Sequence, residues 1–395
     1  MSRIVVTGMG IISSIGEGLD ANRMALKEGR SGISTLELFP SKFSGVLPCG
    51  EIKIPTTSLR EKLQATESGL TRTTLLAHIA FEEAIRDAGW SVNQLHSRET
   101  AFVNATTVGG MCLTDELYHD ANAESEGSAY LSSYDYGSVA IYLQSKYKMN
   151  GIINTVNTAC SSSANSIMFG AKLIKAGLAR RAIVGGVDSL AKFTINGFNA
   201  LHILSPEPCR PFDKYRKGLN LGEAAAFLVM EKAHEATNRK QYAEIAGYGN
   251  TNDSYHPSSL SENGEGPYLS MKEALRTANL QPGDIGFVNA HGTGTENNDE
   301  AESQAMIRLF GKVPLFASTK SNIGHTLGAA GAVEAVFSIF NLFYQEVYAS
   351  IHFQEPIPST RLSPVLVYSN WSGRHVMSNS FGFGGNCSSL IFSKA

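Results

Sequence analysis

The chain has 395 residues, of which 43% are hydrophobic and 17% are charged, so it can bury a large core. The formal net charge is −3 and the 33 Lys and Arg residues are dispersed, which gives no indication of a nucleic-acid partner. Five cysteines without a CxxC pair argue against a disulfide framework or a zinc ribbon, and they fit a reducing cytoplasm. We expect no membrane span, because no uninterrupted apolar stretch matches the thickness of a bilayer.

Short strand-like runs alternate along the chain with longer segments of helical period. The expected strands, in chain order, are Ile4–Thr7, Ala101–Asn104, Ala182–Val184, Phe227–Met230, Ile285–Asn289 and Leu315–Ser318. The expected helices are Thr73–Ala88, Ser163–Ala176, Gly266–Ala278 and Gly328–Phe343. Two further segments, Met111–Tyr136 and Asn250–Pro267, are expected to be loops. This alternation predicts an α/β fold.

An internal echo indicates that the α/β unit is duplicated. The run FVNA occurs at Phe102–Ala105 and again at Phe287–Ala290, each time followed by glycines. A weaker echo relates Val6–Gly10 to Ile245–Gly249. Because the echoes come in the same order, we expect two similar halves, residues 1–242 and 243–395, within one compact body.

Cys160 lies where an extended, β-branched run turns into a helical pattern. The start of a helix offers free N–H groups and partial positive charge, which favours the thiolate form of a nearby cysteine. Cys160 is therefore a candidate nucleophile, although most cysteines outside disulfides only fill a core.

Two histidines in glycine-rich segments are the other reactive candidates. His291 lies in the run HGTGT, whose small residues leave room for a ligand. His325 precedes a glycine- and alanine-rich helix start, where the small residues could instead serve helix packing. Lys320 is expected to support the structure, for instance by pairing with Glu334. The C-terminal run NSFGFGG could donate a backbone N–H to an oxyanion, or it could be a glycine bulge.

Taken together, these motifs resemble those of β-ketoacyl-[acyl carrier protein] synthases of the elongating, Cys-His-His type. TACSS, HGTGT, KSNIGHTLGAAG and NSFGFGG stand in the family's order and span nearly the whole chain. The resemblance implies a thiolase-like fold, with duplicated α/β halves in a five-layered αβαβα arrangement. It also implies an acyltransferase that condenses malonyl-carrier protein, with loss of carbon dioxide, with an acyl group held on Cys160.

The resemblance assigns a role to each matching residue. Cys160 would be the nucleophile, and its N–H and that of Phe383 would form the oxyanion hole, with Phe383 also the gate. His291 and His325 would stabilise the enolate that decarboxylation produces. The supporting residues it implies are Lys320 and Glu334 for orientation, Thr293 and Thr295 for the phosphopantetheine arm, Val108 for the acyl pocket, and Arg210 and Arg72 for docking of the carrier protein.

The expected substrates are carried on the phosphopantetheine of an acyl carrier protein, and no metal or other cofactor is expected. The family's usual Gly-Gly-Thr-Asn is Gly384–Cys387 here, and its Gly-Glu-Gly-Ala is Gly222–Ala225. These departures indicate a specialised synthase of an aryl polyene or polyketide pathway rather than the general fatty-acid enzyme. The resemblance also implies a dimer, either of two identical chains or with a non-catalytic chain-length factor.

Two alternatives remain open. A thiolase-like acyltransferase would use a second cysteine as a base, and Cys387 in the last glycine loop invites that comparison. A non-catalytic partner subunit would typically lack the nucleophile, whereas Cys160, His291 and His325 are all present here.

Overall fold

The computed structural model describes residues 3–123, 125 and 127–395. Its principal strands form two sets that join where Val5 and Val6 pair with Glu244 and Ala243. The first set, in spatial order, is β6 (Ile153–Val156), β5 (Thr100–Ala105), β7 (Arg181–Asp188), β8 (Ala224–Lys232) and β1 (Ile4–Ser13). The second is β11 (Leu315–Ala317), β10 (Phe287–Asn289), β14 (His375–Phe381), β15 (Asn386–Ser393) and β9 (Ala243–Asn252).

The two sets have the same topology. In each, the second strand is parallel to both its neighbours, whereas the last three strands are antiparallel. This repetition confirms the predicted duplication of the α/β unit. The second set starts with β9 at Ala243. The division into residues 1–242 and 243–395 as separate units stays a prediction.

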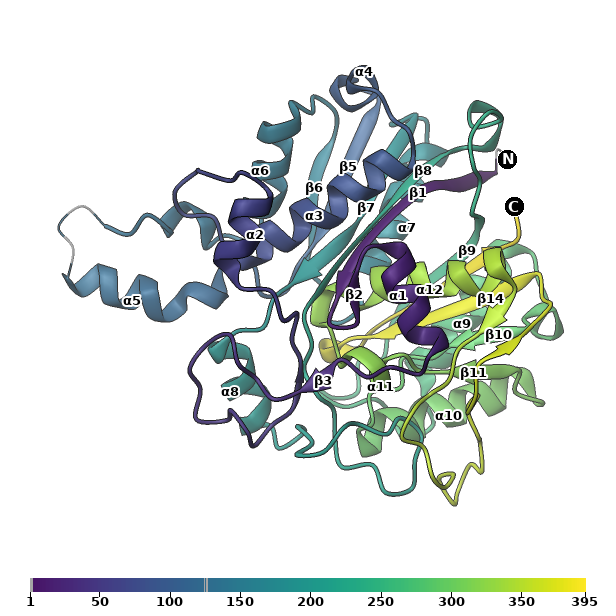
Figure 1. Cartoon of the computed structure of the whole chain (residues 1–395). Helices are drawn as coiled ribbons and strands as arrows, with labels where there is room; N and C mark the ends of the chain where they lie inside the picture. Colours follow the sequence, from purple (N-terminus) through teal and green to yellow (C-terminus); the bar gives the residue numbers. More distant parts are fainter. Residues whose placement is uncertain (1–2, 124, 126) are drawn as a thin grey trace.

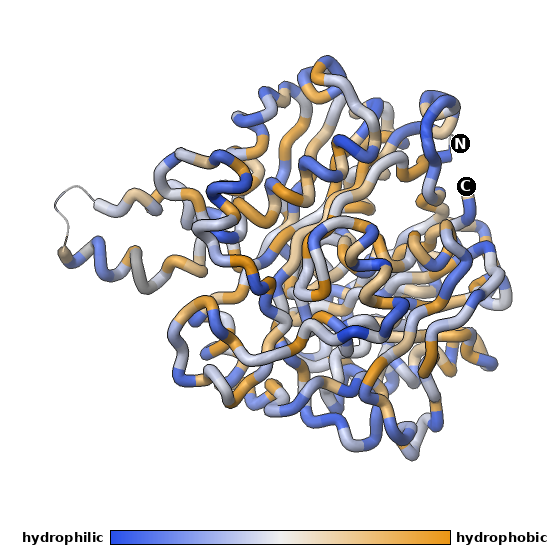
Figure 2. The backbone as a smooth tube through the Cα atoms, viewed as in Figure 1, coloured by the Kyte–Doolittle hydropathy of each residue, from blue (hydrophilic) through white to orange (hydrophobic). Residues whose placement is uncertain are grey.

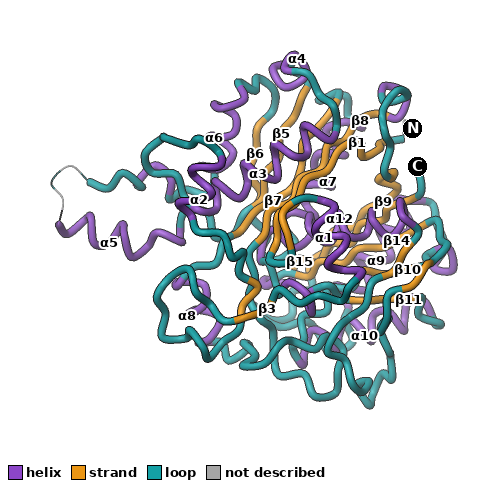
Figure 3. The backbone as a smooth tube through the Cα atoms, in the orientation of Figure 1, coloured by secondary structure: helices purple, strands orange, loops and turns teal. Residues whose placement is uncertain are grey.

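Helices cover both sheets and also fill the space between them (Figures 1 and 3). The outer face of the first set carries α3 (Arg72–Asp87) and α6 (Ser138–Tyr147). Between the two sets of strands lie α7 (Ser162–Lys175) and α12 (Ala330–Tyr344), which contact each other and both sets. The outer face of the second set carries α9 (Glu265–Ala278) and α10 (Glu296–Phe310). The expected αβαβα order of layers is therefore confirmed.

The remaining elements are short. The helices are α1 (Leu19–Lys27), α2 (Thr56–Lys62), α4 (Val92–His96), α5 (Thr114–Ala123), α8 (Lys192–Ala200) and α11 (Lys320–Ile323). The strands are β2 (Gly16–Glu17), β3 (Ile33–Ser34), β4 (Cys49–Gly50), β12 (Glu346–Val347) and β13 (Ser369–Asn370).

Helix α12 is buried along almost its whole length because sheets and helices surround it. The stretch Leu327–Tyr344 has a mean hydropathy of 1.5 and is long and apolar enough to cross a membrane, contrary to expectation, but 89% of it is buried inside the protein. By contrast, hydrophilic and hydrophobic stretches recur along the coil of α3, as in a helix with one face on a sheet (Figure 2).

The two sequence echoes differ in what they mark. The weaker echo, Val6–Gly10 and Ile245–Gly249, marks equivalent positions in the two sets of strands, whereas the stronger FVNA echo does not. A Cβ on Gly10 would lie 2.1 Å from the carbonyl oxygen of Ala80 in α3, and one on Gly249 would lie 2.1 Å from that of Ser270 in α9. Each glycine thus lets an outer helix lie directly on its strand. The FVNA runs differ by one residue in register, because Val103 faces the inner helices whereas Val288 packs against α9.

The segment Met111–Tyr136 is not the predicted loop. It contains α5, which projects from the body of the molecule (Figure 1), and short 3-10 turns on either side. Residues 124 and 126 of this prediction lie outside the described part of the chain. The predicted loop Asn250–Pro267 is shorter than expected, since β9 continues to Asn252 and α9 begins at Glu265.

Candidate active site

Cys160 lies in a strained turn between β6 and α7. The preceding residue, Ala159, has a φ of +53°, in the left-handed region that alanine rarely adopts. The Ser162 hydroxyl accepts a hydrogen bond from the Thr158 N–H at 2.8 Å and donates one to the Ala159 carbonyl, which closes the turn. The turn places Cys160 just before α7, only 6% exposed. Strain of this kind persists where the surroundings hold it and is common at active sites.

The thiol and both predicted histidines come together from different parts of the chain. Donor atoms of Cys160, His291 and His325 all lie within 4.8 Å of one another. The two imidazole rings meet edge to face, with centroids 5.3 Å apart and an angle of 87°. All three line a cavity of about 470 Å³ together with other predicted residues, namely Thr293, Thr295 and Phe383.

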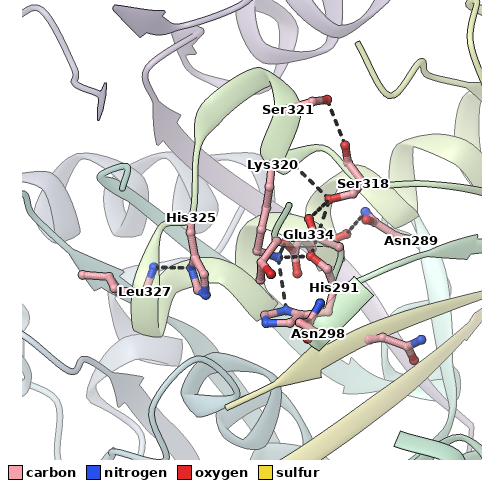
Figure 4. A network of polar contacts seen from close by, with 12 residues as sticks. Asn289, His291, Asn298, Ser318, Lys320, Ser321, His325, Leu327 and Glu334 are labelled. Atoms are coloured by element: carbon pink, nitrogen blue, oxygen red, sulfur yellow. Dashed lines mark hydrogen bonds and ion pairs between the residues drawn. The ribbon is translucent and has the colours of Figure 1, made fainter. Parts of the chain in front are cut away.

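His291 is held by charged groups on both its backbone and its ring. Its N–H and that of Gly292 donate to the buried Glu302 carboxylate at 2.9 and 2.8 Å. The Lys320 ammonium donates to His291 Nδ1 at 3.2 Å and to its carbonyl oxygen at 2.7 Å, and it pairs with Glu334 (Figure 4). Because an ammonium has only donors, Nδ1 accepts, and the ring proton lies on Nε2.

His325 is fixed in the same tautomer by a backbone group. Its N–H donates to the Asn220 carbonyl at 2.7 Å, which anchors the main chain. The Leu327 N–H donates to His325 Nδ1 at 3.0 Å (Figure 4), so this ring also carries its proton on Nε2. Both imidazoles can therefore donate an N–H to the same small region next to Cys160.

Burial keeps both histidines neutral. Desolvation, followed by the charge of Lys320, holds the pKa of His291 and of His325 well below the usual value of 6.5. Neutral rings donate a hydrogen bond without already carrying positive charge. The Glu334 carboxyl beneath them has its pKa raised to about 7 by burial, which the Lys320 charge opposes.

The backbone N–H groups at the helix start favour the Cys160 thiolate, as expected, but burial of the side chain opposes them more strongly. Burial raises the pKa of Cys160 to about 11. The Lys320 charge and the backbone N–H groups of Phe383 and Cys160 lower the pKa, but by less than burial raises it. These two N–H groups are the ones predicted to receive an oxyanion.

We expect alkylation of Cys160 by iodoacetamide to accelerate with pH throughout the neutral range. The thiolate is the reactive form, and below a pKa of about 11 its fraction grows about tenfold per pH unit. The measurement is the rate of adduct formation between pH 6 and 9, read by intact mass. Cys160→Ala is the control for other thiols. A rate that levels off below pH 8 would contradict the raised pKa.

Phe383 lines the cavity, and its role as a gate stays a prediction. It lies in the turn Phe383–Gly385, where Gly384 and Gly385 have φ of +80° and +82°. Its ring stacks on Phe198 of α8, with centroids 5.8 Å apart and planes at 18°. Phe198 was not predicted from the sequence, because no motif surrounds it.

Thr293 and Thr295 lie side by side at the cavity. Their hydroxyl oxygens are 2.8 Å apart. The Thr293 N–H and the Gly294 N–H donate to the buried Asp299 carboxylate, which fixes the loop that carries both threonines. Asp299 and Glu302, on successive turns of α10, were not singled out from the sequence.

The departures in the last glycine loop have a structural account. Asn386 Oδ1 accepts hydrogen bonds from the Ser161 hydroxyl at 2.7 Å and from the amides of Asn165 and Asn250, both at 2.9 Å. Asn386 thereby joins the gate turn to the residue after the nucleophile. Cys387 is buried in a cluster with Leu260, Ala301 and Phe381. Among the described residues that line the cavity, the cysteine is Cys160 and not Cys387. This arrangement disfavours Cys387 as a catalytic base.

Three predicted residues lie outside the cavity wall. Val108 is buried in a cluster behind His325 that includes Leu190 and Leu327. Arg210 is a quarter exposed and lies 3.3 Å from Glu207. Arg72 is only 10% exposed at its side chain. Its guanidinium donates to the Glu223 carboxylate and to the carbonyls of residues 52 and 54, so it is not available as a docking residue.

The three reactive side chains at the cavity could also hold a metal ion. The thiol and two imidazoles at the cavity are a donor set that zinc also uses, so the absence of a metal stays a prediction. Four buried oxygens have no partner among the described residues, namely Asn289 Oδ1, Ser378 Oγ, Ser380 Oγ and Glu334 Oε2. Ordered water commonly satisfies buried oxygens of this kind.

The sequence and the structure were compared with those of known proteins. Residues 1–236 match the family "Beta-ketoacyl synthase, N-terminal domain", and residues 242–354 match "Beta-ketoacyl synthase, C-terminal domain". The chain is 34% identical to "3-oxoacyl-[acyl-carrier-protein] synthase 2" of Vibrio harveyi, covering 99% of this chain and 98% of that protein.

Solved structures agree with this match. "The ishigamide ketosynthase/chain length factor" has a TM-score of 0.93 at 29% identity, covering 100% of this chain and 99% of that one. The ketosynthase ApeO in complex with its chain length factor ApeC from Xenorhabdus doucetiae has a TM-score of 0.87 at 29% identity, covering 100% and 98%.

The chain therefore belongs to the β-ketoacyl synthase family. The predicted thiolase-like fold is confirmed. The protein is an acyltransferase that catalyses the chain-elongating condensation of this family.

Proposed function

We propose that Cys160 holds the growing acyl chain while His291 and His325 act on the extender. The Cys160 thiolate attacks the carbonyl of an acyl thioester, and the carrier thiol leaves with a proton. Negative charge on the carbonyl oxygen develops beside the N–H groups of Cys160 and Phe383, which converge on the sulfur. The observation that carries this proposal is the grouping of the thiol and two Nε2–H imidazoles within 4.8 Å.

In the second half-reaction, malonyl thioester loses carbon dioxide and leaves an enolate. The two imidazole N–H groups stabilise its oxygen, and Lys320 and Glu334 keep His291 oriented without touching the substrate. The enolate carbon then attacks the Cys160 thioester, and the tetrahedral intermediate collapses to release the β-ketoacyl thioester and the Cys160 thiolate. Every step uses groups of this chain, so the proposal needs no added cofactor.

The substrates are proposed to arrive on an acyl carrier protein. Thr293 and Thr295 stand at the cavity, where they can hydrogen-bond a phosphopantetheine arm. For docking of the acidic carrier protein we keep Arg210 and leave out Arg72, whose charge is used inside the protein. The cytoplasm stays the expected compartment.

We further propose that the chain works as a dimer, with a second copy or with a chain-length factor. Strand β6 lies at the edge of the sheet and is only partly buried. Ile141 on the adjacent α6 is 62% exposed. An unpaired sheet edge beside an exposed apolar side chain is suited to a partner subunit. The names of two structural relatives pair a ketosynthase with a chain length factor, which supports a partner of this kind. An aryl polyene or polyketide pathway stays our proposal for this chain.

The test is a product assay with malonyl-carrier protein and a panel of acyl-carrier donors. The expected product is a β-ketoacyl-carrier protein, formed with one carbon dioxide per condensation and seen by intact mass. Acyl transfer without release of carbon dioxide would favour the thiolase-like alternative. A chain that forms no adduct with any donor, alone or with a partner subunit, would contradict the proposal.

A further inference from the structure

Asp188 is a fully buried carboxylate that joins the two halves of the fold beside the active site. It is the last residue of β7 and has no exposed surface. From the first half it accepts hydrogen bonds from the Thr106 and Thr107 hydroxyls at 2.6 and 2.5 Å and from the Thr107 and Val108 N–H groups at 3.0 and 2.9 Å. From the second half it accepts one from the Gly328 N–H at 2.6 Å.

This carboxylate is satisfied entirely by uncharged donors. Among the described residues no cation lies within ion-pair distance of it, and the groups that oppose its desolvation are hydroxyls and backbone amides. A buried carboxylate without a cation is costly unless such donors surround it. An apolar residue in this place would leave the N–H groups of Thr107, Val108 and Gly328 buried without an acceptor, so these donors depend on the Asp188 carboxylate.

The bond to Gly328 bears directly on His325. Leu327, which lies between them, has a φ of +53°, a strained conformation for leucine. The amides on either side of this residue point to different acceptors, because the Leu327 N–H bonds His325 Nδ1 at 3.0 Å and the Gly328 N–H bonds Asp188. Asp188 therefore holds the strained turn in the orientation that fixes the tautomer and direction of the His325 ring.

The space around this contact is tight. A Cβ on Gly328 would lie 2.8 Å from Asp188 Oδ2 and 3.0 Å from the Thr107 Cγ2 atom. Because the backbone at residue 328 is packed this closely against Asp188, its N–H group has little room to turn toward another acceptor. The same carboxylate also holds the Thr106–Val108 segment, and Val108 packs in one cluster with Leu327.

We propose that Asp188 is a positioning residue for the decarboxylation half-reaction, acting on His325 through the Leu327–Gly328 turn. The inference rests on the proposed role of His325. Asp188 does not touch the Cys160 turn, so it affects decarboxylation more than acylation of Cys160. Misplacing a catalytic donor by about 1 Å can cost on the order of a hundredfold in rate.

The test compares two single-turnover rates in Asp188→Asn. The first is acylation of Cys160 by acetyl-carrier protein, followed by intact mass. The second is release of carbon dioxide from malonyl-carrier protein by the acetylated enzyme. We expect acylation to stay within about threefold of the unmodified protein and decarboxylation to fall about ten- to a hundredfold. A residue that merely supports the fold would lower both rates together and would lower the melting temperature in proportion.

Three further variants keep the outcome decisive. Thr107→Val removes one hydroxyl that donates to Asp188 but keeps the hydrogen bond from the Gly328 N–H. The decarboxylation rate should therefore stay within about threefold of that of the unmodified protein. Gly328→Ala disturbs the Asp188 contact from the other side and should reproduce the selective loss, even if Asp188→Asn does not fold. His325→Ala is the reference for the proposed role itself.

The results separate the two proposals. If His325→Ala decarboxylates like the unmodified protein, the proposed role of His325 is wrong. If His325→Ala is slow while Asp188→Asn and Gly328→Ala decarboxylate normally, or lose both rates equally, only the positioning role of Asp188 is overturned.

Discussion

Replacement of His325 by alanine is expected to slow decarboxylation of malonyl-carrier protein by about a hundred- to a thousandfold. The variant removes one of two N–H donors placed beside Cys160, while His291 remains held by Lys320 and Glu302. Acylation of Cys160 should change little, because the oxyanion donors in that step are backbone groups. The measurement is carbon dioxide release in a single turnover, alongside adduct formation by intact mass.

His325→Gln is the matched control for this prediction. Its side-chain amide can place an N–H donor near the position of Nε2, so it should recover part of the rate that alanine loses. The low pKa of both histidines adds a second check, since decarboxylation should not lose activity as the pH falls through 6.5. Equal rates for the alanine variant and the unmodified protein would refute the assignment.

Cys160→Ala is expected to abolish condensation, with a loss of about a thousandfold or more. No other described cysteine lines the cavity, so no acyl adduct should form on the variant. Decarboxylation of malonyl-carrier protein should persist, because both imidazoles keep their partners. Intact mass after incubation with an acyl-carrier donor measures the adduct, and the β-keto product measures condensation.

Cys387→Ser provides the control, since this cysteine is buried behind Leu260 and Phe381 and does not itself line the cavity. It should keep its adduct and its condensation rate within about threefold if the variant remains folded. An adduct that survives in Cys160→Ala would place the nucleophile elsewhere. Loss of condensation in Cys387→Ser, with the adduct still formed, would revive the thiolase-like alternative.

Sequence motifs predicted some residues of the site and not others. Cys160, His291 and His325 were predicted because each stands in a distinctive glycine- or serine-rich context. Asp188 and Phe198 have no such context and act through contacts with residues distant in the sequence. Arg72 shows the opposite error, since the resemblance implied a docking residue, whereas the structure pairs its guanidinium with Glu223 inside the protein.

The fold shows the same division between local and distant information. Most strands and helices were predicted close to their positions, because the alternation of apolar residues is a local property. The two FVNA runs are shifted by one residue relative to each other in the two halves, because identical residues do not determine which face of a sheet each side chain occupies. The segment 111–136 was predicted as a loop because acidic, small and aromatic residues are mixed in it, although residues 114–123 form α5.

The sequence by itself determined the class of the fold, the identity of the thiol and two imidazoles, and the family to which they belong. These follow from residue type and spacing, which are properties of the chain. Only the tertiary structure decided the protonation and orientation of the three groups. Burial raises the pKa of Cys160 to about 11 and lowers that of both histidines, and Lys320 and the Leu327 N–H select the Nε2–H tautomer. Desolvation and hydrogen bonding depend on neighbours that only folding brings together.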